Sequence, residues 1–392
     1  MKKVFVISAT RTPIGSFGGM LSNIKATQLG AHAIKGALSK AKVKPEMVEE
    51  VFMGNVASAN LGQAPARQSA IFAGIPNTVP CSTINKVCAS GAKSIMFGAQ
   101  SIMLGQKDIV VVGGMENMSQ IPFYLPKARY GYKFGSGQVI DGLQHDGLTD
   151  VYNECLMGVC ADNTATKYDI SREDQDNFAI GSYEKSAEST KSGLFKNEIT
   201  PIEIPQRKGD PILMDEDEEF KKVKFEKIPN LRPAFSKEGT VTAANASTIN
   251  DGAAALVLAS EEAVKKHNLT PIAEVVSFTD AAHEPEWFTT APTKATTELM
   301  SMNDMTLDDV DYFEVNEAFS VVTLAYNKLL KVPSEKVNVL GGSVSLGHPL
   351  GASGARIVVT LINVLHEKNG TTGVAAICNG GGGASALLLK KV

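Results

Sequence analysis

The chain has 392 residues, of which 43% are hydrophobic and 20% are charged, and its formal net charge is -4 at pH 7. This length and composition predict a globular protein with two compact domains, each with its own core. The negative charge argues against a surface that neutralises nucleic-acid phosphates, so we predict no nucleic-acid partner.

The sequence predicts neither export nor membrane insertion. The first apolar run extends only from Val4 to Ala9, which is too short for the core of a signal peptide. No stretch approaches the roughly 18 to 20 uncharged apolar residues that a spanning helix needs. We therefore predict a cytoplasmic protein with no membrane partner. The five cysteines are widely scattered, which argues against a disulfide framework and a zinc site.

Short apolar runs alternate with helical patterns through the first part of the chain. The predicted strands are residues 4–9, 50–56, 83–87 and 108–112, and the predicted helices are residues 26–39, 64–73 and 89–103. This alternation is typical of βαβ units, so we expect a mainly parallel sheet with helices on its faces. Ligands of such sheets bind beyond the carboxyl ends of the strands.

An internal repeat relates the two ends of the chain. Ala-Ser-Gly-Ala-Lys at residues 89–93 reappears as Ala-Ser-Gly-Ala-Arg at residues 352–356, 263 positions later. Asn55 and Asn316, which both end strand-like runs, lie 261 positions apart. Two such halves, related by a pseudo-twofold axis, are expected to form a layered α/β/α/β/α body.

The last strand of each half also repeats, but at a different spacing. The matching runs begin at Gly252 and Gly383, only 131 positions apart. In the first half this strand follows a long polar interruption with many charges. We therefore predict three parts: an N-terminal half of residues 1–117 plus 244–268, an inserted loop domain of residues 118–243, and a C-terminal half of residues 269–392.

Cys88 is the first candidate catalytic residue. It follows a predicted strand and immediately precedes the helix that begins near Ala89. Free N–H groups and the helix dipole at such a position stabilise a thiolate, so we expect a lowered thiol pKa and a nucleophile. A small buried apolar residue is the alternative, and both interpretations remain open at this point.

His348 lies in the matching segment of the second half, residues 346–352, just before a predicted helix, and the pseudo-twofold axis brings it towards Cys88. A neutral imidazole there could take the thiol proton and later return it to a departing thiol. Flanking Gly347 and Pro349 predict a rigid turn. A surface histidine or a hydrogen-bonded core histidine is the alternative.

Cys378 and Asn316 also lie at predicted strand ends. Cys378 is followed by Asn379 and four glycines, whose backbone N–H groups could face an oxyanion, although a flexible turn would have the same composition. Asn316 either caps the helix that follows it or orients a water or carbonyl.

Four segments resemble the signature blocks of thiolases in order and spacing. They are Asn-Lys-Val-Cys-Ala-Ser-Gly at 85–91, Asn-Glu-Ala-Phe at 316–319, Gly-His-Pro-Leu-Gly at 347–351 and Cys-Asn-Gly-Gly-Gly at 378–382. The resemblance covers essentially the whole chain and is nearest to acetoacetyl-CoA thiolases, including the animal mitochondrial type. It implies duplicated βαβαβαββ halves and an acetyl-CoA C-acetyltransferase, which condenses two acetyl-CoA molecules reversibly by a ping-pong mechanism.

The resemblance also implies roles for individual residues. Cys88 would be the acylated nucleophile, His348 its activating base, and Cys378 the carrier of the α-proton of the second acyl-CoA. One oxyanion hole would consist of His348 and a water held by Asn316, and the other of the backbone N–H groups of Cys88 and Gly380. The residues implied to contact coenzyme A or the acyl group are Tyr183, Lys227, Ser247, Met157, Phe288 and Phe319.

The resemblance implies no organic cofactor, and a homotetramer built as a dimer of dimers. The aromatic and basic stretch at residues 123–130 suits a contact between subunits or an edge for an anionic ligand. A potassium ion is implied near the loops that bind coenzyme A, with Tyr183, Ala243, Ala244, Ala246 and Val344 around it.

Two departures from the family pattern concern the acyl chain. Leu156 stands where short-chain relatives have His, and Thr289 follows Phe288 where the animal enzyme has Pro. We expect the bulk of Met157 and Phe288 to favour a small acyl group.

Three other functions remain to be weighed. They are a broader 3-ketoacyl-CoA thiolase, a decarboxylating β-ketoacyl synthase, and a non-catalytic relative that binds CoA or lipid. The synthase needs no second acid–base cysteine, so Cys378 favours a thiolase. The presence of all four blocks argues against a non-catalytic protein.

Overall fold

The structure is a computed structural model that describes residues 2–392, so residue 1 of the predicted N-terminal half lies outside it. Its main sheet has the strand order β14-β15-β16-β13-β1-β12-β5-β3-β4, with β2 beside β12. The first half contributes β1 (Val4–Arg11), β2 (Gly15–Ser16), β3 (Glu50–Gly54), β4 (Cys81–Ile84), β5 (Ile109–Asn117) and β12 (Asn250–Ser260). The second half contributes β13 (Ala273–Ala282), β14 (Tyr312–Val315), β15 (Thr372–Asn379) and β16 (Gly383–Lys391).

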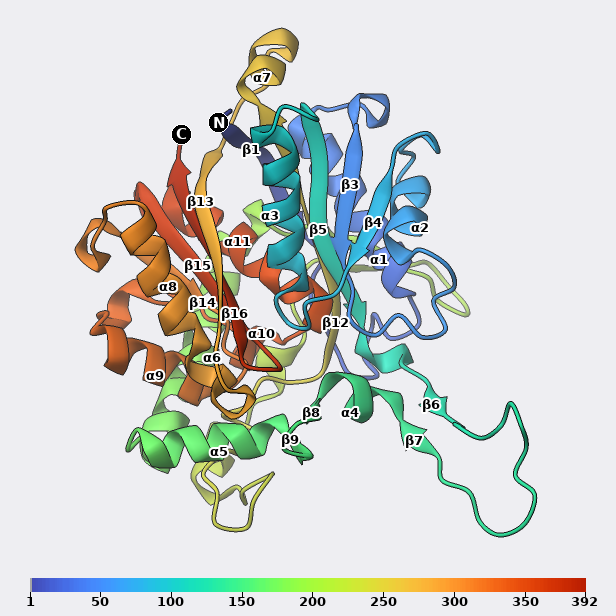
Figure 1. Cartoon of the computed structure of the whole chain (residues 1–392), viewed down its shortest axis with the longest axis vertical. Helices are drawn as coiled ribbons and strands as arrows, with labels where there is room; N and C mark the ends of the chain where they lie inside the picture. Colours follow the sequence, from blue (N-terminus) through green and yellow to red (C-terminus); the bar gives the residue numbers. More distant parts are fainter. Residues whose placement is uncertain (1) are drawn as a thin grey trace.

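Helices lie between the two halves of the sheet and on both outer faces (Figure 1). Central helices α3 (Ser90–Met103) and α11 (Leu350–Glu367) share one buried cluster with strands of both halves. The outer helices are α1 (Ala26–Ala41) and α2 (Pro65–Phe72) on the first half, and α8 (Ala291–Met302) and α9 (Ser320–Leu330) on the second. The expected α/β/α/β/α order of layers is therefore confirmed.

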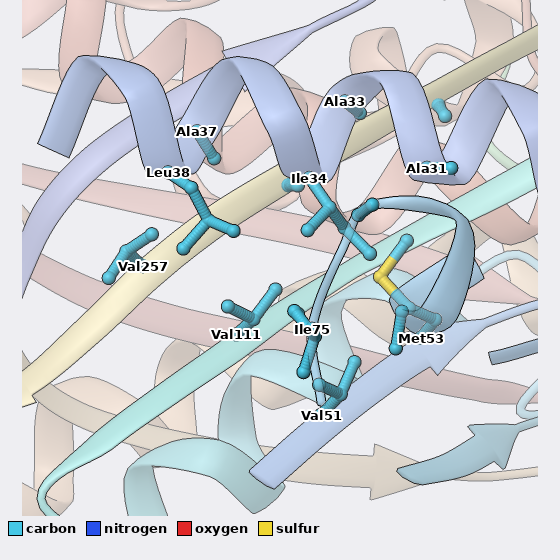
Figure 2. Close-up of a cluster of buried hydrophobic side chains, with 14 of the residues drawn as sticks. Ala31, Ala33, Ile34, Ala37, Leu38, Val51, Met53, Ile75, Val111 and Val257 are labelled. Carbon is cyan, nitrogen blue, oxygen red and sulfur yellow. The ribbon is translucent and has the colours of Figure 1, made fainter. Parts of the chain in front are cut away.

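The core beneath α1 illustrates how an outer layer is held. Alanines and longer aliphatic residues alternate on the buried face of α1, and Ile34 and Leu38 point towards Val111 and Val257 of the sheet (Figure 2). Because alanines let the helix approach the strands closely, the longer side chains fill the remaining space. Burial of each such side chain contributes roughly 1.5–3 kcal/mol.

The expectation of a mainly parallel sheet is wrong. Strand β3 is parallel to β4 and β5, and β14 is parallel to β15, but β12 and β16 run antiparallel to both of their long neighbours. A parallel connection needs a crossover helix, whereas β15 returns directly as β16 through the short glycine turn at residues 380–382. The halves form one continuous sheet because β1 also pairs with β13.

The second half departs from the implied βαβαβαββ pattern at one strand. Where β4 stands in the first half, the second half has an isolated parallel bridge between Phe313 and Val337, followed by the short helix α10 (Ser343–Leu346). Asn338 explains the local arrangement, because its side chain donates to and accepts from the backbone of Val315. An amide side chain thus replaces part of a ladder between strands.

The chain leaves the sheet after β5 and returns to it at β12. The regular elements between them are β6 (Phe123–Tyr124), β7 (Ile140–Asp141), α4 (Gly142–Gly147), β8 (Thr149–Asp150), β9 (Cys155–Leu156), α5 (Met157–Lys167), α6 (Arg172–Lys191), β10 (Ile202–Ile204) and β11 (Ile212–Met214). The loop joining β6 and β7 extends away from the layers (Figure 1). After β12, α7 (Glu261–His267) leads to the second half. In residues 2–392 we find no helix with both the length and the apolarity to cross a bilayer.

Central helices α3 and α11 contact each other through glycine. A Cβ atom on Gly91 would lie 2.6 Å from the backbone nitrogen of Ala355, closer than the 3.0 Å that real Cβ atoms keep. The same substitution on Gly354, the repeat partner of Gly91, would meet the backbone nitrogen of Ala92. Both glycines lie in the first two turns of their helices, so the crossing brings the two N-termini together.

Replacing either glycine at this crossing should destabilise the protein. We expect Gly91→Ala and Gly354→Ala each to lower the free energy of unfolding by about 1–3 kcal/mol, because backbone cannot move aside as a flexible side chain can. Urea unfolding measures the change. Gly181→Ala on α6 is the matched control: its Cβ would meet no described atom within 4 Å, so stability should rise by about 0.5–1 kcal/mol. Equal effects at all three positions would contradict a close crossing.

Candidate active site

A cavity of about 600 Å³ lies where the N-termini of α3 and α11 converge. Its wall contains these residues singled out from the sequence: Cys88, His348, Gly380, Ser247, Met157, Phe288, Phe319, Ala243 and Ala246. Cys378 and Asn316 are fully buried. Tyr183, Lys227, Ala244 and Val344 are not among the described residues of the wall. A larger hollow of about 810 Å³ over α8 and α9 contains none of these residues.

Cys88 is presented by a strained turn before α3. Val87, a β-branched residue, has a φ of 48°, in the left-handed region that such residues rarely adopt. The Ser90 hydroxyl donates to the carbonyl oxygen of Val87 over 2.6 Å and accepts from the N–H of Lys86 over 2.9 Å, which holds the turn in place. These hydrogen bonds hold the strained turn and so place Cys88 just before the N-terminus of α3.

The expected lowering of the Cys88 pKa is wrong for the free enzyme. Burial raises the pKa of the thiol to about 12, although the backbone N–H groups of Gly380 and Cys88 act in the opposite direction. Removal of a thiolate from water therefore outweighs the stabilisation at the helix start. The same two N–H groups are those implied for an oxyanion hole, and both act on the Cys88 sulfur. At neutral pH the nucleophile is a thiol that needs a base.

His348 is a neutral base with one free nitrogen. Its Nδ1 lies 2.6 Å from the hydroxyl oxygen of Ser353, and that hydroxyl donates to the carbonyl oxygen of Pro349 over 2.9 Å. Since the hydroxyl proton is already used, Nδ1 carries the imidazole proton and Nε2 keeps its lone pair. Nε2 is buried without a hydrogen-bond partner among residues 2–392. Burial, assisted by the charge of Arg356, lowers the His348 pKa to about 3.

Asn316 directs an amide group with free N–H donors. Its Oδ1 accepts a hydrogen bond of 2.7 Å from the Ser343 hydroxyl, so its Nδ2 must point the other way. Nδ2 is buried and has no hydrogen-bond partner in the described part of the chain. A buried donor of this kind is costly unless a ligand or water uses it, which fits the role implied for Asn316.

Cys378 lies at the end of β15, beside the glycine turn that carries Gly380. Burial raises the pKa of Cys378 well above its usual range, and the charge of a Cys88 thiolate would raise it further. The two sulfurs are therefore electrostatically coupled. A thiolate formed at Cys378 would be a strong base, because the pKa of its conjugate thiol is high.

Aromatic side chains enclose the cavity beside Met157, the first residue of α5. The Phe288 and Phe319 rings meet edge to face with centroids 6.4 Å apart, and Phe235 packs on Phe319 from the other side. Of the two departures from the family pattern, Leu156 lies in the wall, whereas the Thr289 hydroxyl is buried 2.6 Å from that of Thr164. Of these two residues, only Leu156 is therefore placed to contact an acyl chain.

Sequence reasoning missed several residues that hold the site. Ser353 sets the tautomer of His348, and the Asn250 side chain accepts from the His348 backbone N–H over 3.0 Å. The Glu116 carboxylate accepts from the N–H of Val56 and of Gly351, and so joins the first half to the start of α11. Ser353 could have been noticed, since it follows His348 by about one helical turn.

Tyr183 offers the side-chain oxygen among the implied potassium ligands. Burial raises the pKa of its hydroxyl, and the nearby carboxylates of Glu219 and Glu317 raise it further. This negative surrounding fits a cation. Ala243, Ala244, Ala246 and Val344 could contribute only backbone carbonyl oxygens, which are suitable hard donors.

Two family models together match most of the chain. The family model "Thiolase, N-terminal domain" matches residues 4–262, and "Thiolase, C-terminal domain" matches residues 269–391. The chain belongs to the thiolase family. It is 54% identical to acetyl-CoA acetyltransferase 1 of Arabidopsis thaliana over 391 residues, which are 99% of this chain and 94% of the relative.

Two further relatives are similar over nearly their whole length. Acetyl-CoA acetyltransferase IA of Candida tropicalis is 52% identical over 392 residues, 99% of this chain and 97% of the relative. The crystal structure of Acat5 thiolase from Ascaris suum in complex with coenzyme A has a TM-score of 0.95 and 48% identity, with both chains covered completely.

The raised pKa of Cys88 predicts how the free enzyme reacts with an alkylating agent. Because the thiol is protonated below about pH 12, its alkylation by iodoacetamide should accelerate about tenfold for each unit between roughly pH 7 and 9. Peptide mass spectrometry follows the label on Cys88, and a short peptide with one exposed cysteine is the control, since its rate should level off near the ordinary thiol pKa of about 8.5. A rate that is already constant across this range would contradict a protonated thiol.

Proposed function

We propose that the protein is an acetyl-CoA C-acetyltransferase, which condenses two acetyl-CoA molecules to acetoacetyl-CoA and CoA and catalyses the reverse reaction. The observation that carries the proposal is the position of Cys88, His348 and Gly380 in one cavity, with a free Nε2 on His348. The similar proteins named acetyl-CoA acetyltransferases support the choice of substrate.

In the first half-reaction the neutral pair is activated by proton transfer. His348 Nε2 takes the Cys88 proton as Sγ attacks the thioester carbonyl carbon, and the backbone N–H groups of Cys88 and Gly380 donate to the oxyanion. The new S–C bond forms, the bond to the CoA sulfur breaks, and His348 returns the proton to the departing thiolate. The product is acetyl-Cys88 and free CoA.

In the second half-reaction Cys378 gives its thiol proton to the free Nε2 of His348, and the Cys378 thiolate removes a proton from the methyl group of another acetyl-CoA. Acetylation leaves no ionisable thiol at Cys88, so no charge on that sulfur opposes the ionisation of Cys378 after the first step. The enolate oxygen is stabilised at His348 and by a water on the Asn316 amide. The enolate carbon attacks acetyl-Cys88, the C–C bond forms, and the Cys88 thiolate leaves and takes its proton from the His348 imidazolium.

The alternatives fit the cavity less well. A decarboxylating synthase would have no use for a second cysteine whose ionisation is coupled to Cys88. A broader 3-ketoacyl-CoA thiolase would need room for a longer chain, whereas Met157, Phe288 and Phe319 occupy one side of the cavity. A non-catalytic relative would not need a free base at His348. A panel of straight and 2-methyl-branched 3-ketoacyl-CoA substrates tests the acyl preference.

Coenzyme A is the ligand that we propose for the open end of this cavity. The Ascaris suum thiolase was crystallised with it, and Ser247 lies in the wall with its backbone N–H donating to Ala318 over 3.0 Å. Tyr183 and Lys227, which are not among the described residues of the cavity wall, are proposed to contact the same ligand. A cytoplasmic location is also proposed, since a relative from Gibberella zeae is named as cytosolic.

The two cysteines should fail in different steps. Cys88→Ser should abolish both acetoacetyl-CoA synthesis and acetyl transfer between acetyl-CoA and CoA, because both need the nucleophile. Cys378→Ala should abolish synthesis but retain measurable acetyl transfer, which needs no α-proton base. Isotope exchange into CoA reports the transfer. Loss of both activities to the same extent in Cys378→Ala would refute this division, and Cys155→Ala is the control that should retain both.

We propose a homotetramer, a dimer of dimers, that uses the extended β6–β7 loop. Phe123, Tyr130 and Phe134 are largely exposed on this loop, and exposed aromatic residues of this density mark an interface. Light scattering should report four subunits. Replacement of the three aromatic residues by serine should yield dimers, and a wild-type protein that is dimeric at all concentrations would contradict the tetramer.

A potassium ion at Tyr183 is proposed to steady the loops beside Ser247. Replacing sodium by potassium at constant ionic strength should then lower the KM for acetyl-CoA in the wild type. Tyr183→Phe should reduce the response, since it removes the side-chain oxygen proposed as a ligand. Identical kinetics in the two salts would remove the ion from the account.

A further inference from the structure

The Asn316 amide has a counterpart in the first half that is used differently. Asn55 stands at the repeat-related position, and its Oδ1 accepts from the Ser58 hydroxyl over 2.6 Å. Its Nδ2, however, donates to the Glu116 carboxylate over 2.8 Å. In both halves a serine therefore fixes the amide oxygen, but only in the second half is the amide nitrogen left free. The orientation of Asn316 then depends on the group that fixes the hydroxyl of Ser343.

Arg356 holds that serine. Its Nη2 donates to the Ser343 hydroxyl oxygen over 2.8 Å, and the hydroxyl donates to Asn316 Oδ1 over 2.7 Å. Because the Ser343 hydroxyl oxygen accepts a hydrogen bond from the guanidinium, the hydroxyl proton points towards the amide oxygen and donates to it. The repeat partner of Arg356, Lys93, instead bonds to Asp280 at 2.6 Å, so this chain of contacts is a property of the second half alone.

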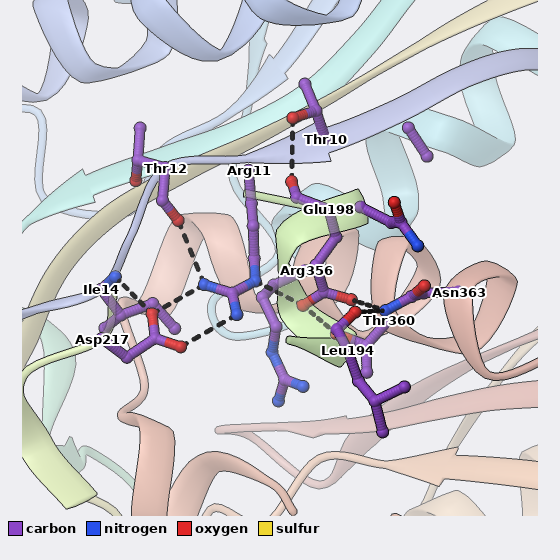
Figure 3. A network of polar contacts seen from close by, with 12 residues as sticks. Thr10, Arg11, Thr12, Ile14, Leu194, Glu198, Asp217, Arg356, Thr360 and Asn363 are labelled. Atoms are coloured by element: carbon purple, nitrogen blue, oxygen red, sulfur yellow. Dashed lines mark hydrogen bonds and ion pairs between the residues drawn. The ribbon is translucent and has the colours of Figure 1, made fainter. Parts of the chain in front are cut away.

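Stability does not explain a buried arginine at this place. The neighbouring Arg11 is fully paired, with bonds of 2.6–2.9 Å to Glu198 and Asp217, whereas Arg356 points away from these carboxylates (Figure 3). Its carboxylate, Glu314, is 3.7 Å from Nη1, beyond hydrogen-bond distance. Burial also raises the pKa of Glu314 to about 8, so its carboxyl group is largely protonated at neutral pH and compensates the buried guanidinium poorly for its lost hydration.

We propose that Arg356 is a positioning residue for catalysis, which acts through Ser343 to aim the Asn316 amide at the water that stabilises the enolate oxygen of the substrate. Its charge also faces His348 and favours the neutral imidazole. Arg356 touches neither substrate nor the reacting sulfurs. The inference rests on the function proposed above, since it needs an oxygen in the cavity for the amide to bind.

A double-mutant cycle with acetoacetyl-CoA synthesis as the readout tests the proposal. Ser343→Ala and Arg356→Lys are expected to lower kcat by about tenfold to a hundredfold with KM changed by less than about twofold, because misplacement of an oxyanion donor acts on the transition state. Neither substitution should lower the rate further in an Asn316→Ala background. Ser343→Ala removes a single hydroxyl, so it remains informative should Arg356→Lys fold poorly.

The matched control is Thr360→Val, one helical turn from Arg356 on α11. It removes a buried hydroxyl that donates to Glu198 over 3.2 Å and does not reach Asn316, so kcat should be unchanged even if the melting temperature falls. Equal loss of rate from Ser343→Ala in the wild-type and Asn316→Ala backgrounds would overturn the proposal. A wild-type protein without thiolase activity would instead refute the proposed function.

Discussion

The active site depends on the contact between two helix backbones at Gly91 and Gly354. Only glycine allows α3 and α11 to cross so near their N-termini. The end of β3 approaches the start of α11 equally closely, because a Cβ atom on Gly54 would lie 2.7 Å from the Gly351 carbonyl oxygen. The crossing sets Cys88 and His348 at one cavity, although they come from different halves. A duplicated fold thereby becomes a single catalytic centre, with Cys88 from the turn before α3 and His348 from the turn before α11.

The same convergence buries His348 and Cys378 and leaves Cys88 half-buried in the cavity wall, and this decides their charges. Out of water, thiols keep their protons and an imidazole loses its own, so the pKa of Cys88 rises to about 12 while that of His348 falls to about 3. The resting pair is therefore neutral, and ionisation occurs only as substrate is attacked. His348 donates a hydrogen bond to Ser353, and Ser343, held by Arg356, donates one to Asn316. These bonds fix the orientations of the His348 ring and of the Asn316 amide.

Much of this arrangement could be predicted from the sequence, because it follows from local patterns and from the repeat. The alternation of apolar runs with helical patterns predicted the strands and helices of the first half. The internal repeat by itself predicted that His348 lies near Cys88. The direction of β12 and β16 was missed, since apolar periodicity does not distinguish a hairpin from a crossover. The sign of the Cys88 pKa shift was also missed, because burial is set by distant segments while a helix start is visible locally. Ser353 and Arg356 act through single hydrogen bonds, which spacing cannot specify.

We infer that the crossing of α3 and α11 positions Cys88 to carry the acyl group. The most direct measurement is rapid acid quenching of the enzyme mixed with acetyl-CoA, followed by peptide mass spectrometry of the whole chain. We predict an acetyl group on Cys88 and its absence in His348→Ala quenched at the same early time, with acetylation recovering slowly at high pH. An acetyl group on Cys378 or another residue, with Cys88 unmodified, would contradict the account.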